Sequence, residues 1–458
     1  MFRYTFTARL IFILALVAVA LTIAGSRQTA HAANFAVTKT ADTADGTCDS
    51  DCSLREAVIA SNASTGLDAI SLPSGTYSLT MAGGSEDSAA TGDLDIIHDV
   101  TITSAGAATA IVEGDGLDRV FDIDPLGTGI TVEMSGLTIR NGGGVPGGAG
   151  IRNGGMLTLT AVAISGNTAE NDGGGLFNSS TGTVTITDST LSGNTASGPL
   201  SFGGGVENSN GKLTLTNSIV SGNTVGALGF GGGIDNGAFM SNGTLTLTSS
   251  TIRGNTAGTG GAIRQSGGTV TIANTTLSDN TAAVSAGGVL FEGSGTLTLL
   301  NSNIIGNSAA GNGGGMEVSG GTVSIVSSAI ISNAAAGDGG GIFNNGDISF
   351  TNSTISSNNA SSSGSGILNS VAGNLTSTNS TIAGNNAPSG LHNSGTARLK
   401  NTIIGSNKGA DCVVPAAITS LGHNLDSDGT CGLAGPGDLP NRDPRLGPLE
   451  FTTGPTFW

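Results

Sequence analysis

The feature that most constrains this chain is a phrase that returns about every 27 residues. Its form is Ser-Gly-Asn-Thr or a close variant, and ten of its asparagines span residues 167 to 407. A fixed period of 20 to 50 residues is typical of solenoids and propellers, in which each unit contacts only its neighbours. The repeated asparagines are Asn167, Asn194, Asn223, Asn255, Asn280, Asn307, Asn333, Asn358, Asn385 and Asn407, and Asn141 fits one period earlier.

The composition of one period predicts strands and sharp corners. Residues 243–250, Gly-Thr-Leu-Thr-Leu-Thr-Ser-Ser, alternate apolar and hydroxyl side chains, as a strand with one buried face does. The Ser-x-Ile-x-Gly-Asn phrase and the Gly-Gly-Gly-Ile-x-Asn phrase predict two further short strands. Glycine and asparagine between them adopt the positive φ values that tight corners need. Three short strands in 27 residues are too few for a propeller blade and predict a right-handed parallel β-helix of about eleven or more coils.

The chain also divides along its length. Arg3 and Arg9 precede an apolar run from Leu10 to Ala24, and Ala30-His31-Ala32 offers a cleavage site. We therefore expect a signal peptide at 1–32 and a secreted or cell-surface protein; a membrane anchor is the alternative. The expected order continues with an N-terminal cap and first coils at 33–135, β-helix repeats at 136–410 and a C-terminal cap at 411–458. No other segment is long and apolar enough to cross a membrane as a helix, so we expect no transmembrane span in the mature chain.

Each end carries one pair of cysteines. Export permits disulfides, and local pairing of Cys48 with Cys52 and of Cys412 with Cys431 is the connectivity we expect; zinc binding by all four is the alternative. Ser53 and Glu56 form a capping box before an apolar helical face, which predicts a short helix at 53–60 that plugs the first coil. The nearby Asp42, Asp45, Asp49 and Asp51 could bind Ca²⁺, but they lack the EF-hand spacing, and a solvated, disulfide-pinned loop is the explanation we favour.

These end segments resemble a known family. Residues 43–63, TADGTCDSDCSLREAVIASNA, and the following Asp68 to Tyr77 are similar to bacterial secreted proteins with a CSLREA domain. Residues 420–431 and 443–449 resemble the choice-of-anchor Q region, and the coils resemble polymorphic outer-membrane protein repeats. The resemblance implies an exported β-helix of unassigned function, often associated with the cell surface. Because the family pattern continues beyond Gly-Pro-Thr with an apolar segment, we expect the natural product to extend past residue 458.

The charge and the motifs narrow the function. The net charge is −17, and only 16 residues are Lys or Arg, so we expect no nucleic-acid binding. No cofactor motif is present. We expect a monomeric, non-catalytic structural or adhesive protein that binds extracellular or cell-surface glycans or proteins. A surface-binding threonine array is a further alternative.

The other alternative is a carbohydrate-active enzyme, a polysaccharide lyase or hydrolase. One outward position follows each Gly-Gly-Ile phrase, and on three successive coils it is Glu207, Asp235 and Arg264, roughly 5 Å apart. Glycoside hydrolysis uses paired carboxylates, so these three residues are the candidate catalytic group. We nevertheless expect a mixed, solvated face at these positions. The full row is Arg152, Phe177, Glu207, Asp235, Arg264, Leu290, Glu317, Phe343, Leu368 and His392.

Overall fold

The structure is a computed structural model that describes residues 32–84, 86–237, 242–386 and 388–447. The expected signal peptide up to residue 31 and the last eleven residues, 448–458, lie outside the described residues. The expectations of a cleaved leader and of a longer natural product both fall on those segments.

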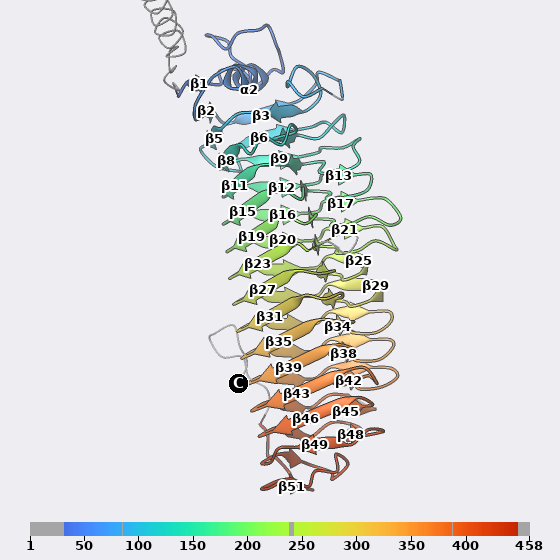
Figure 1. The fold of residues 1–458 in the computed structure, drawn as a ribbon. Coiled ribbons are helices and arrows are strands. Elements are labelled where there is room, and N and C mark those ends of the chain that lie inside the picture. The colour runs from blue at the N-terminus through green and yellow to red at the C-terminus, as the bar shows by residue number, and fades with distance from the viewer. Residues whose placement is uncertain (1–31, 85, 238–241, 387, 448–458) are drawn as a thin grey trace, which may run out of the picture.

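The predicted right-handed parallel β-helix is confirmed. The chain winds into a rod in which four sheets run along the axis, with 15, 13, 15 and 8 strands among the described residues (Figure 1). Neighbouring strands come from successive coils and pair in parallel, as β23 does with β27 and β22 with β26. The sheets continue without a break across residues 135 and 410, so the coils form one rod.

The strand bounds follow sheet by sheet. The first 15-stranded sheet holds β1 Asn34–Ala36, β2 Asp68–Leu72, β5 Val100–Ser104, β8 Thr131–Ser135, β11 Met156–Thr160, β15 Thr183–Thr187, β19 Lys212–Thr216, β23 Thr244–Thr248, β27 Thr269–Ala273, β31 Thr296–Leu300, β35 Thr322–Val326, β39 Asp347–Thr351, β43 Asn374–Thr378, β46 Thr396–Lys400 and β49 Ile418–Ser420. The 13-stranded sheet holds β4 Leu94–Ile96, β7 Phe121–Ile123, β10 Ile151–Asn153, β14 Leu176–Asn178, β18 Val206–Asn208, β22 Ile234–Asn236, β26 Ile263–Gln265, β30 Val289–Phe291, β34 Met316–Val318, β38 Ile342–Asn344, β42 Ile367–Asn369, β45 Ser389–Asn393 and β48 Ala410–Val413.

The second 15-stranded sheet holds β3 Gly75–Ser78, β6 Ala110–Glu113, β9 Thr138–Arg140, β12 Ala163–Ser165, β16 Thr190–Ser192, β20 Ile219–Ser221, β24 Thr251–Arg253, β28 Thr276–Ser278, β32 Asn303–Ile305, β36 Ala329–Ile331, β40 Thr354–Ser356, β44 Thr381–Ala383, β47 Ile403–Gly405, β50 Leu425–Asp426 and β51 Leu439–Pro440. The 8-stranded sheet holds β13 Thr168–Ala169, β17 Thr195–Ala196, β21 Thr224–Val225, β25 Thr256–Thr259, β29 Thr281–Ser285, β33 Ser308–Ala309, β37 Ala334–Ala335 and β41 Asn359–Ala360.

A coil in the middle of the rod therefore has four strands, one more than the sequence predicted. The additional strand follows the repeated asparagine and is only two residues long in most coils, as in β17 and β37. Two residues are too few to show an alternating pattern, so this strand is visible only in its pairing with the next coil.

The core is a column of apolar side chains along the axis. In β23, Leu245 and Leu247 point inward and are fully buried, and in the next coil Val270 and Ile272 lie in register with them. The outward threonines between them remain partly exposed. Removing one such leucine to alanine costs about 2–5 kcal/mol in a packed core, which explains the strictness of the alternation.

Buried asparagines connect one coil to the next at a corner. Asn255 donates from Nδ2 to Asn280 Oδ1 at 2.9 Å and to the Val220 carbonyl at 3.1 Å, and its own Oδ1 accepts from Asn223. The same bond joins every consecutive pair of the ten predicted asparagines from Asn167 to Asn407. A second ladder, Asn153 to Asn178, Asn208, Asn236 and Gln265, runs at another corner.

Asn141 does not extend the first ladder, contrary to the sequence alignment. Strand pairing places Arg140 opposite Ser165, so Asn141 matches Gly166 and Gly142 matches Asn167. Asn141 instead forms the corner with φ +52°, where Gly166 has φ +64°. Asparagine is among the few residues with a side chain that tolerate this conformation, which explains the ambiguity in the sequence.

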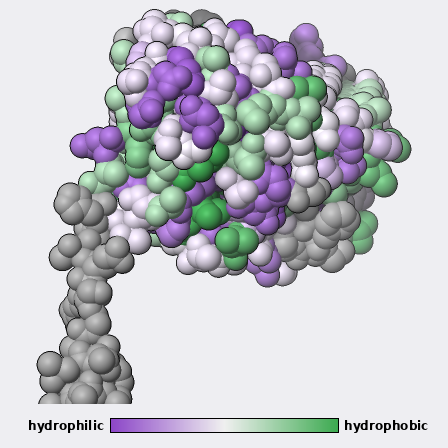
Figure 2. All heavy atoms as spheres, turned by 90° about the horizontal axis from the view of Figure 1, so that it is seen from above, coloured by the Kyte–Doolittle hydropathy of each residue, from purple (hydrophilic) through white to green (hydrophobic). Residues whose placement is uncertain are grey.

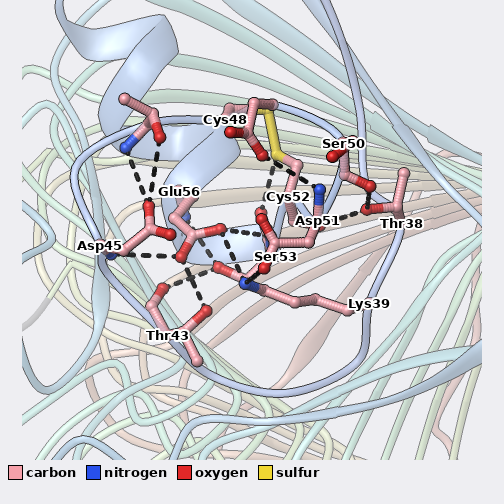
Figure 3. Close-up of a disulfide and its surroundings, with 12 residues drawn as sticks. Thr38, Lys39, Thr43, Asp45, Cys48, Ser50, Asp51, Cys52, Ser53 and Glu56 are labelled. Carbon is pink, nitrogen blue, oxygen red and sulfur yellow. Dashed lines mark hydrogen bonds and ion pairs between the residues drawn. A yellow bond between two sulfur atoms is a disulfide. The ribbon is translucent and has the colours of Figure 1, made fainter.

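The helix α2, Leu54–Asn62, lies at the end of the rod opposite β51 (Figure 1). Ser53 is its N-cap: the Ser53 hydroxyl accepts from Glu56 N at 3.1 Å, and Glu56 accepts from Ser53 N at 2.7 Å. Burial raises the pKa of Glu56, but hydrogen bonds from Ser53, Thr43 and Asp45 and the Lys39 ammonium outweigh it and hold the pKa at about 2 (Figure 3). The capping box thus also fixes the preceding loop.

Both ends contain the expected cysteine pairs as disulfides. Cys48 is bonded to Cys52 beside the capping box (Figure 3), and Cys412, in β48, is bonded to Cys431. Seen from above, at the end that carries α2, the surface is mixed, with hydrophilic residues around separate hydrophobic areas (Figure 2). None of the helices in the described part of the chain is both long and apolar enough to span a bilayer.

Candidate functional site

The row of side chains expected from the Gly-Gly-Ile phrases lies in register along the outer face of the 13-stranded sheet. Glu207 in β18 is paired with Asp235 in β22, and Asp235 with Arg264 in β26. The pairing continues in both directions through the whole predicted row, from Arg152 to His392. Sequence spacing therefore located this face correctly.

Two phenylalanines lie on the segments that directly precede two strands of this row. Phe202 precedes β18 and Phe230 precedes β22, and isolated bridges align Asp172, Phe202 and Phe230 on successive coils. The two rings are stacked with centroids 5.4 Å apart and an interplanar angle of 13°. The Arg264 guanidinium lies over both, 4.6 Å from the Phe230 centroid and 5.5 Å from that of Phe202. Cation–π attraction of this kind holds a guanidinium in place.

Arg264 is held by two carboxylates as well. Its Nη1 lies 3.3 Å from Asp235 Oδ2, and its Nε donates to Glu292 Oε1 at 2.7 Å. Burial lowers the pKa of Arg264, but Asp235 and Glu292 outweigh burial and raise it. The guanidinium is thus a fixed cation between two coils, and its side chain is only 9% exposed.

Glu207 and Asp235 are buried, which corrects the expectation of a solvated face. Their residues are 1% and 0% exposed, and Glu207 Oε2 and Asp235 Oδ1 have no hydrogen-bond partner. Burial, followed by the charges of Asp235 and Asp172, raises the pKa of Glu207 well above its ordinary value. Burial also raises the pKa of Asp235, to about 7, against the opposing effect of Arg264. Glu207 therefore favours its neutral form, whereas Asp235 pairs with Arg264.

A groove of about 750 Å³ opens on this face of the rod. Its wall contains the two phenyl rings and Arg264, but neither Glu207 nor Asp235. Aromatic walls with a few polar groups are typical of small-molecule sites. The lining residues are Leu200, Phe202, Phe230, Asn242, Arg264, Ser266, Gly267, Glu292, Gly293 and Ser294.

A smaller hollow of about 350 Å³ lies along the same sheet toward the N-terminal end. It is lined by Arg119, Pro146, Gly147, Arg152, Asp172 and Phe177. Arg119 Nε lies 2.7 Å from Asp93 Oδ2, and Arg152 Nη1 lies 3.0 Å from Asp122 Oδ2. The arginines of this hollow are therefore paired with acids, as Arg264 is.

Asp93, Asp95 and Asp122 form an acidic group whose oxygens lie within 4.8 Å of one another. Burial and the neighbouring acids raise the pKa of Asp93 to about 8, and burial raises the pKa of Asp95 to about 7. Such oxygens could hold a divalent cation. Sequence reasoning missed this group, although Asp95 and Asp122 stand at the centre of β4 and β7 and continue the predicted row by two coils.

The four aspartates proposed as a Ca²⁺ loop do not converge. Asp42 pairs with Arg55 at 2.7 Å, Asp51 pairs with Lys39 at 3.1 Å, and Asp45 and Asp49 accept hydrogen bonds within their own turns. Each carboxylate is therefore used by a different partner. Within the described ranges, a second acidic group is formed by Asp411, Asp426 and Asp428 near the C-terminal disulfide.

One comparison with known proteins, a match to a family model, agrees with the fold. A family model described as "Right handed beta helix region" matches residues 236–408. The A-module of the Azotobacter vinelandii mannuronan C-5 epimerase AlgE4 is 14% identical, with a TM-score of 0.41 over 87% of this chain and 97% of that one. The AlgE6 A-module of the same organism is 15% identical, with a TM-score of 0.40 over 87% and 96%. No curated protein matches this sequence.

Proposed function

We propose that this chain is an exported, surface-associated β-helix protein that binds glycans in the groove beside Phe202 and Phe230 and does not convert them. The resemblance of the end segments to CSLREA and choice-of-anchor Q proteins supports export and surface association. The partner we propose is an extracellular or cell-surface glycan, bound by a monomer without a cofactor or nucleic acid.

The wall of the groove is the observation that carries this proposal. The partly exposed Phe230 and the exposed Leu200 offer an apolar surface to the C–H face of a sugar, and Ser266, Ser294 and Asn242 in the same lining offer hydrogen bonds. Acid–base catalysis requires a carboxyl group within hydrogen-bonding reach of the substrate. Glu207 and Asp235 do not reach the groove wall, so this geometry favours binding over turnover.

A glycan array followed by calorimetry on the mature protein tests the binding. Phe230→Ala removes one wall and should weaken the affinity for the array's best glycan at least tenfold, because aromatic anchors dominate such interfaces. Phe343→Ala, half-buried on the same sheet two coils beyond Leu290, is the matched control and should leave affinity unchanged. Equal affinities of the wild type and Phe230→Ala would contradict the proposal.

A polysaccharide lyase or hydrolase is the second candidate, because one observation favours it. Glu207 and Asp235 are adjacent carboxyl groups with raised pKa values, a combination that is enriched in active sites. Turnover would require Arg264 to move and open a path to them. Release of new chain ends from a uronate or neutral polysaccharide, abolished by Glu207→Gln or Asp235→Asn, would establish the enzyme and refute a purely binding role.

A further inference from the structure

We propose that this groove selects uncharged saccharides and discriminates against uronate and other anionic glycans. The inference rests on the proposed function and names the ligand class of the same site. It follows from the ion pairs that the arginines of this face already form with neighbouring acids.

Recognition of an acidic sugar requires a cation that is free to pair with its carboxylate. Arg264 is the arginine in the groove wall, and both ends of its guanidinium already pair with acids, Asp235 and Glu292. Its Cζ atom lies over the two phenyl rings. An incoming carboxylate would have to displace one of these partners and leave it unpaired.

The adjoining hollow offers no better cation. Arg119 lies 2.7 Å from Asp93 and 3.6 Å from Asp122, and Arg152 lies 3.0 Å from Asp122. Three arginines thus face four acidic partners across the two hollows, and Asp172 in the hollow wall adds another carboxyl group. Among the described residues that line the two hollows, each arginine therefore already has an acidic partner, and an anionic chain would find no unpaired cation there.

The rest of the wall suits a neutral sugar. Leu200, Phe202 and Phe230 are the apolar residues of the lining, and the Ser266 and Ser294 hydroxyls and the Asn242 side-chain amide can donate or accept hydrogen bonds without a charge. Binding through such contacts should depend little on ionic strength, whereas pairing of charges is screened as salt increases. The salt dependence of affinity is therefore a second signature of the ligand class.

The experiment is calorimetry of the mature protein with three oligosaccharides of equal length: a neutral hexose oligomer, a uronate oligomer and a glucosamine oligomer. The neutral oligomer should bind at least tenfold more tightly than the uronate oligomer and at least as tightly as the glucosamine oligomer. The affinity for the neutral oligomer should change less than about twofold between about 50 and 500 mM salt, a range over which the screening of charges increases strongly.

A variant at Glu292 tests whether the preference for neutral oligomers arises from the ion pairs of Arg264 or from the shape of the groove. Glu292→Gln keeps the shape of the side chain but removes one acid and frees one side of Arg264, so the preference for neutral over uronate oligomers should narrow at least threefold. Glu133→Gln, an exposed position in β8 on another sheet, is the control and should change neither affinity.

The outcomes distinguish the two proposals. Tightest binding of the uronate or glucosamine oligomer, lost in Phe230→Ala, would overturn the ligand class and leave glycan binding at this groove intact. An unchanged preference in Glu292→Gln would also overturn the electrostatic argument. If none of the three oligomers binds, or if Phe230→Ala binds as well as the wild type, both proposals fail.

Discussion

Asn255 illustrates what a single residue contributes to this rod. Its side chain bonds the coil before it and the coil after it, and none of its surface is exposed. Each buried hydrogen bond contributes about 1 kcal/mol, and a donor or acceptor left without a partner costs about 1–3 kcal/mol. The ladder therefore stabilises the coils through polar groups that the chain could not otherwise bury.

We expect Asn255→Ala to lower the free energy of unfolding by about 3 kcal/mol, because it removes hydrogen bonds to two coils and leaves the partner groups unsatisfied. Urea unfolding followed by circular dichroism measures the change. Asn171→Ala, at an exposed position, is the control and should change stability by less than about 0.5 kcal/mol. Similar effects of the two substitutions would show that the ladder contributes little.

Glu207 should make the stability of the protein depend on pH. Its pKa is raised in the folded protein, and that of Asp235 is raised to about 7, against about 4 for unfolded carboxyls. Groups with raised pKa values contribute stability below pH 4 that is lost as pH increases through 7. Glu207→Gln cannot ionise, so it should match the wild type at pH 4 and exceed its stability by about 1–3 kcal/mol at pH 8.

Unfolding of both proteins in urea at pH 4, 6 and 8 measures this difference, which includes the effect of the substitution on Asp235, whose charge interacts with Glu207. Buried acids that do not interact with Glu207 cancel because both proteins contain them. The exposed Glu133→Gln should follow the wild type throughout. A Glu207→Gln variant that is less stable than the wild type at pH 8 would show that the ionised carboxylate is stabilised in the fold.

At the scale of elements, α2 depends on a buried arginine. The Arg55 side chain is fully buried, pairs with Asp42 at 2.7 Å and donates to the carbonyls of Ala89, Gly92 and Asp93. Asp42 is itself 2% exposed. This one residue therefore connects the helix, the acidic loop and the first coils, which makes it the anchor of the N-terminal cap.

Arg55→Leu should destabilise the cap by about 3–5 kcal/mol, because it leaves the Asp42 carboxylate and three carbonyls without their partner. Hydrogen exchange should show faster exchange in α2, β2 and β4 and little change beyond β14. Arg253→Leu, exposed on β24, is the control. Uniform protection along the Arg55→Leu rod would contradict the role of Arg55 as the anchor.

The sequence was sufficient for the elements that repeat and insufficient for those that do not. The alternation in Thr244 to Thr248 predicted a strand, and the spacing of Glu207, Asp235 and Arg264 predicted one row. Phe202 and Phe230 each directly precede a Gly-Gly-Gly phrase, so the same spacing could have aligned them, although their stacking and their contact with Arg264 are visible only in the structure. The burial of the Glu207 and Asp235 carboxyl groups could not be predicted from their positions in the row alone.

At the scale of the molecule, the rod should tolerate loss of a whole coil but not of a fraction of one. Deleting residues 334–358 removes β37 to β40 and joins Asn333 to β41, so every remaining strand finds an equivalent partner. Deleting only residues 334–345 removes β37 and β38 and brings different faces into register. The first variant should keep the strand spectrum and a cooperative melt, and the second should lose both; equal behaviour would contradict a coil-by-coil fold.

The central claim is that the groove beside Phe202 and Phe230 binds a glycan and returns it unchanged. The most direct measurement is nuclear magnetic resonance of the best array ligand after prolonged incubation with stoichiometric mature protein. We predict line broadening of the ligand that Phe230→Ala abolishes, and recovery of the same molecule after the protein is removed. New reducing ends, unsaturated ends or inverted ring carbons in the recovered glycan would contradict the claim and establish an enzyme.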